Sequence, residues 1–463
     1  MGAGKPASSA RAGKPAGSAR AGKPNIIYIN ADDLGVMDVG YNRGTFKTPN
    51  IDKLAREGMV FTHAYASAAN CAPSRAICFS GQYAPRHGVY TVGNPARGSS
   101  KDRKLIPTEN LTTLRDDIVT MAEALRDGGY TTIHLGKWHL GEDPTMQGFD
   151  INIGGDHKGS PSSTGKYFSP WTGHMQEYSG KYPEGTHRAD VFADEAIKFL
   201  KANKDKPFFV HMAYYLVHTP IQAVPEMQAK YEGKHVNSAY ASMVEKMDES
   251  IGKIISALDE MGLAENTLVL FSSDNGGFFR ESKQHPFRAG KGSYFEGGIR
   301  EPMVARWKGR IESGSKCDTP VSNVDFYPTF LEAAGAKKPK GHVLDGLSIL
   351  PLMLGNGKLP ERPLFWHFPI YLQGGNEDTH DLAMRTRPGS VVRLGDWKLH
   401  EYFEDGRFEL YNLKSDIGER TNLASKNPEK VKELKKILYD WRKKVKAPVP
   451  TELNPEYQKS EPR

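Results

Sequence analysis

The chain has 463 residues, enough for one large domain with a smaller one, or for two domains of ordinary size. Hydrophobic residues make up 38% of it, and no apolar run approaches the ~18 residues of a membrane span, so we expect a soluble globular protein without a membrane partner. The net charge of +7 suits an anionic substrate. No basic stripe interleaved with aromatic residues indicates a nucleic-acid partner.

Residues 1–24 are not expected to belong to the fold. A nine-residue unit of Ala, Gly, Lys, Pro, Ser and Arg opens at Ala3, repeats from Ala12 and restarts at Ala21. It lacks the apolar core of a secretory signal peptide and the bulky residues that could be buried. We expect a disordered segment, either an engineered leader or a flexible basic arm, and favour the leader. No signal peptide is visible in this chain.

Strand and helix patterns alternate from Asn25 onward. Residues 25–30 are a β-branched and aromatic run typical of a buried strand, and Thr48 with Pro49 opens a helix that Gly58 ends. This alternation predicts an α/β fold with a mostly parallel sheet flanked by helices, and ligands beyond the carboxyl ends of its strands. Further strands are expected at 131–135, 208–213, 268–272 and 302–306, and helices at 121–126, 189–201 and 239–261.

The pattern changes after about residue 360. Residues 428–445 have a charged amphipathic pattern that predicts a helix. Short strand candidates joined by Gly and Asp turns precede it and favour an antiparallel sheet, at 364–367, 390–394, 397–402 and 408–413. We therefore predict a large α/β domain at 25–360 and a smaller subdomain at 361–463.

The segment Cys71-Ala72-Pro73-Ser74-Arg75 is the most informative of the chain. Pro73 fits the first turn of a helix, so Cys71 would lie at the helix entrance, where free backbone N–H groups favour an anion. Arg75 adds a planar set of donors suited to sulfate or phosphate. Free cysteines are more often buried and inert. However, a chance match to Pro, Ser and Arg after one of three cysteines is roughly a one-in-a-thousand event, which favours a functional cysteine.

The three cysteines do not indicate a disulfide framework. Cys71 and Cys78 would be ~10 Å apart along one helix, from a rise of ~1.5 Å per residue. That separation exceeds the reach of a disulfide. Cys78 is therefore expected to be a core residue.

Oxygen-bearing side chains follow two of the expected strands. Asp32 and Asp33 follow the first strand, and Asp274 with Asn275 follows the strand at 268–272. Each pair alone is equally well explained by a turn or a helix cap. Together they offer three carboxylates and an amide oxygen, which are hard ligands suited to calcium or magnesium rather than zinc.

These motifs resemble the formylglycine-dependent (type I) sulfatases of the alkaline phosphatase superfamily, over most of the chain from Asn25 to about residue 420. In that family a maturation enzyme oxidises the motif cysteine, here Cys71, to the aldehyde formylglycine. The resemblance implies an alkaline-phosphatase-like domain, a C-terminal subdomain with a four-stranded sheet, and a periplasmic or secreted location. It also implies one Ca²⁺ ion held by Asp32, Asp33, Asp274, Asn275 and the formylglycine at Cys71.

Three further motifs match the family. Lys137-Trp138-His139 would alone more often be a surface basic patch, but it coincides with the family's Lys-x-His. His218-Thr219-Pro220 matches the His-x-Pro segment, and Lys291 matches the remaining lysine. The resemblance implies that His218 protonates the leaving alcohol and that His139 takes a proton as sulfate is released. It further implies that Asp274 is the base and that sulfate oxygens are held by Arg75, Lys137 and Lys291.

We predict a sulfatase acting on a sulfated carbohydrate, such as a galactose unit of an algal polysaccharide or a glycosaminoglycan. The alternatives are a phosphonate or phosphodiester monoesterase and a catalytically silent binder of sulfated polysaccharide. The intact residue set argues against a binder, and the lack of a second histidine set argues against a two-zinc phosphatase. The loop at 159–170 could shape the pocket entrance. Loop residues that could contact a sugar, although surface exposure explains each about as well, are His174, Arg280 and His285, with Trp171, His367, Arg385 and Arg387.

Overall fold

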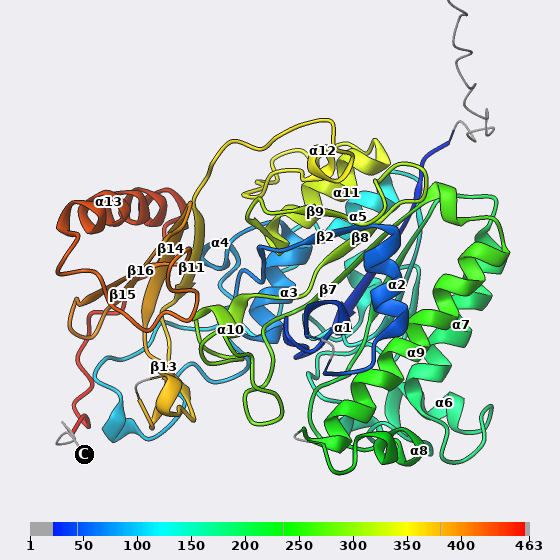
Figure 1. The fold of residues 1–463 in the computed structure, drawn as a ribbon, viewed down its shortest axis with the longest axis horizontal. Helices are drawn as coiled ribbons and strands as arrows, with labels where there is room; N and C mark the ends of the chain where they lie inside the picture. Colours follow the sequence, from blue (N-terminus) through cyan, green and yellow to red (C-terminus); the bar gives the residue numbers. More distant parts are fainter. Residues whose placement is uncertain (1–21, 44, 235, 380, 459–463) are drawn as a thin grey trace, which may run out of the picture.

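The computed structural model describes residues 22–43, 45–234, 236–379 and 381–458. The leader expected at 1–24 therefore lies almost wholly outside the described residues. A large part with helices around a central sheet lies beside a smaller part that carries the long C-terminal helix (Figure 1). In the described chain, no helix is both long and apolar enough to cross a bilayer.

The large part is built on an eight-stranded sheet. Its central strand β1 (Asn25–Ala31) is buried along its whole length, as expected for a parallel strand covered on both faces. Strand β8 (Val304–Arg306) is antiparallel to both of its neighbours, and the remaining strand pairs of this sheet are parallel. The strand order is β5 (Ile151–Ile153), β4 (Thr131–Gly136), β6 (Phe208–Ala213), β1, β7 (Thr267–Ser273), β8, β2 (Met59–Phe61) and β9 (Ser315–Cys317).

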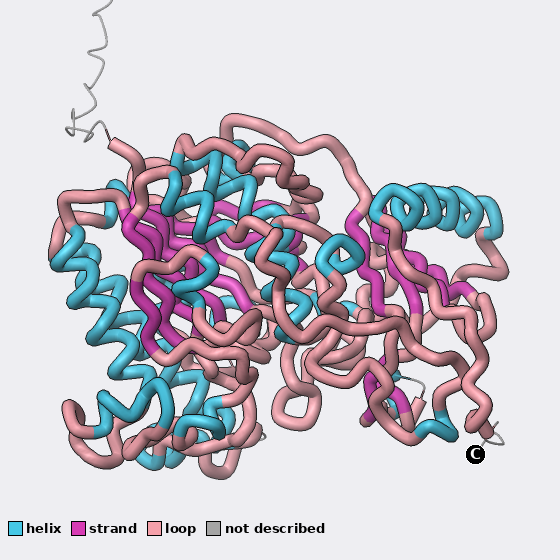
Figure 2. The backbone as a smooth tube through the Cα atoms, turned by 180° about the vertical axis from the view of Figure 1, so that it is seen from behind, coloured by secondary structure: helices cyan, strands magenta, loops and turns pink. Residues whose placement is uncertain are grey.

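Helices cover both faces of this sheet (Figure 2). Side chains alternate across β1, so Ile27 and Ile29 enter one core cluster and Ile26 and Tyr28 the other. The first cluster includes α2 (Pro49–Glu57), α7 (Arg188–Asn203) and α9 (Ser238–Glu260). The second includes α3 (Cys71–Ser80), α5 (Met121–Asp127) and α11 (Phe326–Ala334). Short connecting helices are α1 (Gly40–Arg43), α4 (Ala84–His87), α6 (Gln176–Ser179), α8 (Pro225–Gln228), α10 (Glu296–Ile299) and α12 (Leu350–Met353).

The smaller part is an antiparallel sheet with one covering helix. Helix α13 (Pro428–Val445) packs on the sheet, and Trp441 stacks on Phe365 with ring centroids 4.5 Å apart. This arrangement confirms the predicted α/β fold class with an added four-stranded antiparallel sheet. The strands, in spatial order, are β11 (Leu364–Phe368), β14 (Gly389–Leu394), β15 (Trp397–Tyr402) and β16 (Phe408–Asn412).

Each part also carries a small ribbon, and a buried ionic cluster connects the two parts. Strand β3 (Ala64–Tyr65) pairs with β10 (Val321–Ser322), and β12 (Leu372–Gln373) pairs with β13 (Met384–Thr386). Lys398 on β15 contacts Glu296 of α10 and Glu419, both at 3.0 Å. These contacts hold the small sheet against the large domain. The β12–β13 ribbon is joined to the large domain separately, because Arg385 Nη1 of β13 donates to the Lys291 carbonyl at 3.1 Å.

Candidate active site

The carboxyl ends of three parallel strands place polar residues at one edge of the large sheet. Asp32 and Asp33 follow β1, Lys137 follows β4, and Asp274 with Asn275 follows β7. Asp33 has φ 63°, a left-handed conformation that is uncommon outside glycine and concentrates at functional sites. The location agrees with the rule that ligands bind beyond the carboxyl ends of such strands.

Two of the buried carboxylates are each paired with a lysine. Lys137 Nζ lies 2.6 Å from Asp32 Oδ2, and Lys291 Nζ lies 2.6 Å from Asp33 Oδ1. Burial and the neighbouring Asp274 carboxylate raise the pKa of Asp32 well above its usual value. Burial also opposes ionisation of Asp33, but Lys291, His218 and Lys137 together with the hydrogen bond from Asn275 outweigh it and lower the pKa of that carboxyl. The two adjacent aspartates thus occupy different electrostatic environments.

Arg75 links the cysteine helix to this cluster. Its Nε donates to Asp274 Oδ2 at 2.9 Å, and its Nη1 donates to the carbonyl of Lys137 at 2.7 Å. Burial disfavours the charged guanidinium, but Asp274 and Asp32 overcome that effect and raise its pKa. Arg75 therefore stays a fixed cation at the base of the site.

Several buried polar atoms of the cluster have no hydrogen-bond partner among the described residues. They include Asp32 Oδ1, Asn275 Oδ1 and Arg75 Nη2, and buried polar groups of folded proteins are normally paired. Asn275 Nδ2 donates to Asp33 Oδ1 at 2.9 Å, which leaves the amide oxygen as the free atom. Unpaired carboxylate and amide oxygens fit a hard divalent cation, and the unpaired Arg75 nitrogen fits an anion.

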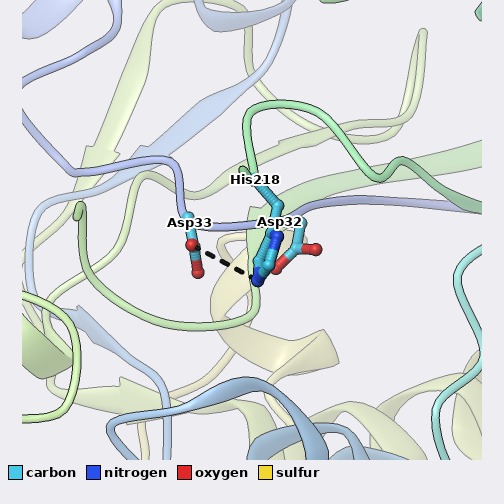
Figure 3. A group of neighbouring side chains, drawn as sticks. All are labelled: Asp32, Asp33 and His218. Carbon is cyan, nitrogen blue, oxygen red and sulfur yellow. Dashed lines mark ion pairs between the residues drawn. The ribbon is translucent and has the colours of Figure 1, made fainter. Parts of the chain in front are cut away.

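His218 lies beside the two adjacent aspartates. One ligand atom from each of Asp32, Asp33 and His218 falls within 4.8 Å of the others. His218 points toward Asp33, with Nε2 4.0 Å from Oδ2 (Figure 3). Its Nδ1 donates to the Thr219 carbonyl at 2.7 Å. Burial and the Lys291 ammonium lower the pKa of His218 to about 3.

Cys71 is the first residue of α3, as the sequence predicts, and it is only 3% exposed. Asn70 precedes the helix, and its side-chain Oδ1 is buried without a partner among the described residues. Cys78 lies in the core with its thiol 3.9 Å from the Tyr28 hydroxyl, and burial raises its pKa to about 12. All three cysteines are free. The cysteine at the helix entrance and the inert core cysteine are thus distinct, as expected.

The His139 ring occupies space that Gly159 leaves open because it has no side chain. His139 has φ 66°, and its Nδ1 is buried without a partner in the described chain. A Cβ added to Gly159 would lie 2.3 Å from His139 Cε1, so a larger residue does not fit there. Burial and the Lys137 ammonium lower the pKa of His139 well below its usual value. The ring is therefore neutral and able to accept a proton.

A cavity of about 470 Å³ opens onto these residues, within the ~300–1,000 Å³ range of small-molecule sites. Both parts of the molecule line it, because Leu372 to Gly374 and Arg385 come from the β12–β13 ribbon. Asp32, Arg75, Lys137 and Asp274 lie one layer deeper, at 0–2% exposure. The predicted catalytic and metal-binding residues that line the cavity directly are Asp33, Cys71, His139, His218 and Lys291.

Of the predicted sugar contacts, the structure places two in this cavity, Arg280 and Arg385. Trp171 is in the core, and His367 is buried against Ser390 and the Pro448 carbonyl. Arg387 is ion-paired with Asp381 and Glu404. His174 and His285 are exposed and do not line the cavity.

Several lining residues were missed in the sequence, among them Asn70, Arg97 and Phe278, whereas the predicted entrance loop contributes Gly159 and Ser160. Asn70 adjoins the cysteine motif, so it could have been proposed from its neighbours. Arg97 and Phe278 lie in loops without a recognisable pattern. Only the fold brings these two residues to the cavity.

Comparisons with known proteins agree with this geometry. The sulfatase family model matches residues 24–336, and the N-sulphoglucosamine sulphohydrolase C-terminal model matches residues 289–444. The chain is 35% identical to a sulfatase of Formosa agariphila, over 87% of this chain and 85% of the relative. It is 34% identical to the N-acetylgalactosamine-6-sulfatase of the dog, over 74% and 68%.

Solved structures give the same result. The crystal structure of Ps i-CgsB superposes with a TM-score of 0.72 at 30% identity, over 90% of this chain and 93% of that chain. The same protein is also known in complex with a k-i-k-neocarrahexaose. Together with the strand-end cluster and the cysteine at the entrance of α3, these matches show that the chain belongs to the sulfatase family and is a sulfuric ester hydrolase.

Proposed function

We propose that this protein hydrolyses sulfate esters of a sulfated carbohydrate, with Cys71 converted to formylglycine and one Ca²⁺ ion bound at the strand-end cluster. The observation that carries the proposal is the set of buried, unpartnered atoms around Cys71, which offers oxygen ligands for a cation and a donor for an anion. The proposed conversion of Cys71 requires a formylglycine-generating maturation enzyme as a partner. The periplasmic or secreted location implied by the resemblance stays a prediction.

The cation site would be formed by Asp32, Asp33, Asp274 and Asn275, with the modified Cys71 as the fifth ligand. Asp32 Oδ1 and Asn275 Oδ1 support this set because both are buried oxygens without partners among the described residues. Bound Ca²⁺ supplies positive charge that favours an ionised oxygen nucleophile. Formylglycine supplies a hydrated aldehyde with two hydroxyl groups, one to attack sulfur and one to allow sulfate release.

The chain's own residues then bind sulfate and move protons. Lys291 lines the cavity and Arg75 has a free Nη2, so both can hold sulfate oxygens as charge builds on them. Lys137, the third predicted cation, contacts Asp32 in this structure. Asp274 would act as the base for the attacking hydroxyl, although it is also paired with Arg75.

The two cavity histidines suit opposite proton transfers. His139 is neutral with a free Nδ1, so it can take the proton that leaves the second hydroxyl when sulfate departs. His218 would give its proton to the leaving alcohol oxygen. An anionic substrate beside His218 offsets the Lys291 charge and favours the protonated imidazole that a proton donor requires.

A carbohydrate substrate is supported by the names of relatives. N-acetylgalactosamine-6-sulfatases are among the curated relatives, and Ps i-CgsB is known with a bound neocarrahexaose. We therefore propose a sulfated galactose-type unit of an algal polysaccharide or a glycosaminoglycan. The cavity volume of about 470 Å³ is compatible with a sugar unit.

The test combines peptide mass spectrometry with kinetics. After co-expression with a maturation enzyme, the aldehyde should be found at Cys71 and not at Cys78 or Cys317. The matured protein should release sulfate from at least one member of a panel of position-defined sulfated saccharides, with a higher kcat/KM than for phenyl phosphonates. A higher kcat/KM for phosphonates across the whole panel would instead identify a phosphonate monoesterase.

A further inference from the structure

Three arginines from distant segments meet in the cavity. Arg97 lies in the loop before residue 100, Arg280 follows β7, and Arg385 lies on β13; all three line the same cavity as Cys71. Arg280 is exposed, and Arg97 and Arg385 are half-buried, whereas Cys71 is buried. The arginines therefore lie nearer to solvent than the cysteine and mark the outer part of the cavity.

These arginines lack acidic partners. No carboxylate oxygen lies within 4 Å of their guanidinium groups in the part of the chain that the structure describes, whereas the nearby Arg387 is paired with both Asp381 and Glu404. Among the described residues, the one acidic side chain that lines the cavity is Asp33, and Lys291 already neutralises it. Burial, together with repulsion from Arg97 and Arg280, lowers the pKa of Arg385 to about 10. This grouping is unfavourable until an anion enters.

Arg385 is held in a fixed orientation. Its Nη1 donates to the Lys291 carbonyl at 3.1 Å and its Nε to the Gly374 carbonyl at 3.3 Å. Its guanidinium lies over the Phe279 ring, 5.1 Å from the centroid. A fixed planar donor can bind an oxyanion without losing side-chain freedom. Arg97 and Arg280 line the same cavity, so the three arginines together form a positively charged surface in its outer part.

The scissile sulfate does not explain why these three arginines gather in the outer part of the cavity. Its oxygens have Lys291 and the free nitrogen of Arg75 in the proposed site, at the buried level of Cys71. An additional anion would pair with the cations of the outer part, where Arg97 and Arg385 are half-buried without an acidic partner in the described chain. Charged side chains that are removed from solvent are normally paired.

We propose that Arg97, Arg280 and Arg385 form a second anion subsite, which selects substrates that carry a further sulfate or carboxylate group on the reacting sugar or on its neighbour. This inference rests on the proposed function, because it takes the group at Cys71 to be the scissile sulfate ester. It narrows the substrate class from sulfated sugars to sugars with at least two anionic groups.

The kinetic test compares matched substrates. A monosulfated galactose, the same sugar with a second sulfate, and a monosulfated hexosamine linked to a uronic acid are assayed with wild type and with Arg97→Gln and Arg280→Gln. We expect either variant to lower the kcat/KM ratio of the doubly to the singly anionic substrate by about 10-fold or more, since one charged hydrogen bond contributes that much. The lower kcat/KM of the doubly anionic substrate should come from a higher KM rather than from a lower kcat. The arm with the larger loss, disulfated sugar or uronate, identifies the second anion.

A matched control removes the same charge elsewhere. Arg310 is exposed and stacks on Trp307 on the surface, so Arg310→Gln should leave the ratio unchanged. An equal loss on singly and doubly anionic substrates in the Arg97 and Arg280 variants would overturn the subsite, because it would indicate only a general effect of positive charge.

A binding measurement separates this inference from the proposed function. Calorimetry with Cys71→Ala protein and the same saccharides needs no turnover. Tighter binding of a doubly anionic sugar, lost in the Arg280→Gln background, would support the subsite even if no saccharide were hydrolysed. Equal affinity for singly and doubly anionic sugars would overturn it even in an active sulfatase.

Discussion

Two clusters of buried charge lie in this molecule, one at the strand ends and one between the two parts, and they differ in how completely their atoms are paired. In the inter-part cluster, Lys398 contacts Glu296 and Glu419 at 3.0 Å, and Arg300 adds a second pair to Glu296 at 3.1 Å. His400 lies 3.1 Å from Glu419. None of these described side chains has a buried polar atom without a partner.

The strand-end cluster has similar ion pairs but is incomplete. Lys137 contacts Asp32 at 2.6 Å and Arg75 contacts Asp274 at 2.9 Å, yet Asp32 Oδ1, Asn275 Oδ1 and Arg75 Nη2 remain unpaired in the described chain. Unpaired buried groups cost free energy, and a bound ligand that pairs with them offsets that cost. The closed cluster therefore stabilises the fold, and the incomplete one marks the site of chemistry.

The largest effect is expected from removing the nucleophile. Cys71→Ala should lower kcat/KM on any sulfate ester by at least ~10⁴-fold, because the aldehyde can no longer be formed. Cys78→Ala is the matched control, since Cys78 is buried in the core and should affect stability rather than chemistry. Sulfate release assays and peptide mass spectrometry measure both variants. Full activity with an unmodified Cys71 would contradict the mechanism.

Removing the proposed proton donor should have an effect that depends on the leaving group. His218→Ala should lower the hydrolysis of a sugar sulfate by ~10²–10⁴-fold, the usual contribution of general acid catalysis. It should spare much of any activity on nitrophenyl sulfate, because a nitrophenolate leaves without protonation.

His139→Ala is the comparison variant. It should lower both activities once release of sulfate limits turnover, because that step is common to every substrate. An equal loss on the two substrates in His218→Ala, with substrate affinity intact, would instead assign His218 to sulfate binding.

Short-range patterns were sufficient for the central strands of the large sheet and for the residues at their carboxyl ends. The three-residue strands β2, β5 and β9 were not predicted, because such short segments carry no clear pattern. β-branched runs ending in acidic residues predicted β1 and β7, and the rule for parallel strands predicted that Asp32 and Asp274 would meet. The strand at 302–306 was predicted, but only Val304–Arg306 pairs, and it runs antiparallel to β7. Whether a strand runs parallel or antiparallel to its neighbour depends on the route of the chain between the two strands, and the local sequence pattern does not specify that route.

The outer cavity was less predictable. His174 and His285 were chosen as polar loop residues, but loop chemistry alone does not determine which loops converge. Arg385 reaches the cavity because the β12–β13 ribbon is held near the strand ends, and Arg97 arrives from a loop nearly 300 residues earlier in the chain. Such contacts between distant segments leave no periodic signal.

The difference in pairing between the two clusters can be tested by measuring the free energy of unfolding with and without Ca²⁺. Lys398→Met removes the central cation of the closed cluster and should lower the free energy of unfolding by ~3–5 kcal/mol, the cost of leaving buried carboxylates unpaired. Chemical denaturation measures this value. The variant should still gain stability from added Ca²⁺, by ~2.7 kcal/mol at 100 times Kd.

Asp32→Asn is the reciprocal variant in the incomplete cluster. It should lose most of the Ca²⁺-dependent gain, because a carboxylate ligand is replaced by a neutral amide. A gain of equal size in Asp32→Asn and wild type would contradict the assignment of the cation to this cluster, as would a gain abolished by Lys398→Met.

The smallest effect is expected from a change that adds one methyl group beside the incomplete cluster. In Gly159→Ala the new Cβ would lie 2.3 Å from His139 Cε1, so the imidazole must move. A catalytic group displaced by about 1 Å can cost ~10²-fold in rate, and we expect a loss of that order in kcat with little change in melting temperature. Gly180→Ala is the matched control, because a Cβ there meets no atom within 4 Å.

Since His139 is proposed to act after the alcohol has left, the loss should be similar for sugar and nitrophenyl sulfates when sulfate release limits turnover. A loss confined to sugar sulfates would mean that Gly159 shapes the sugar site rather than the position of His139.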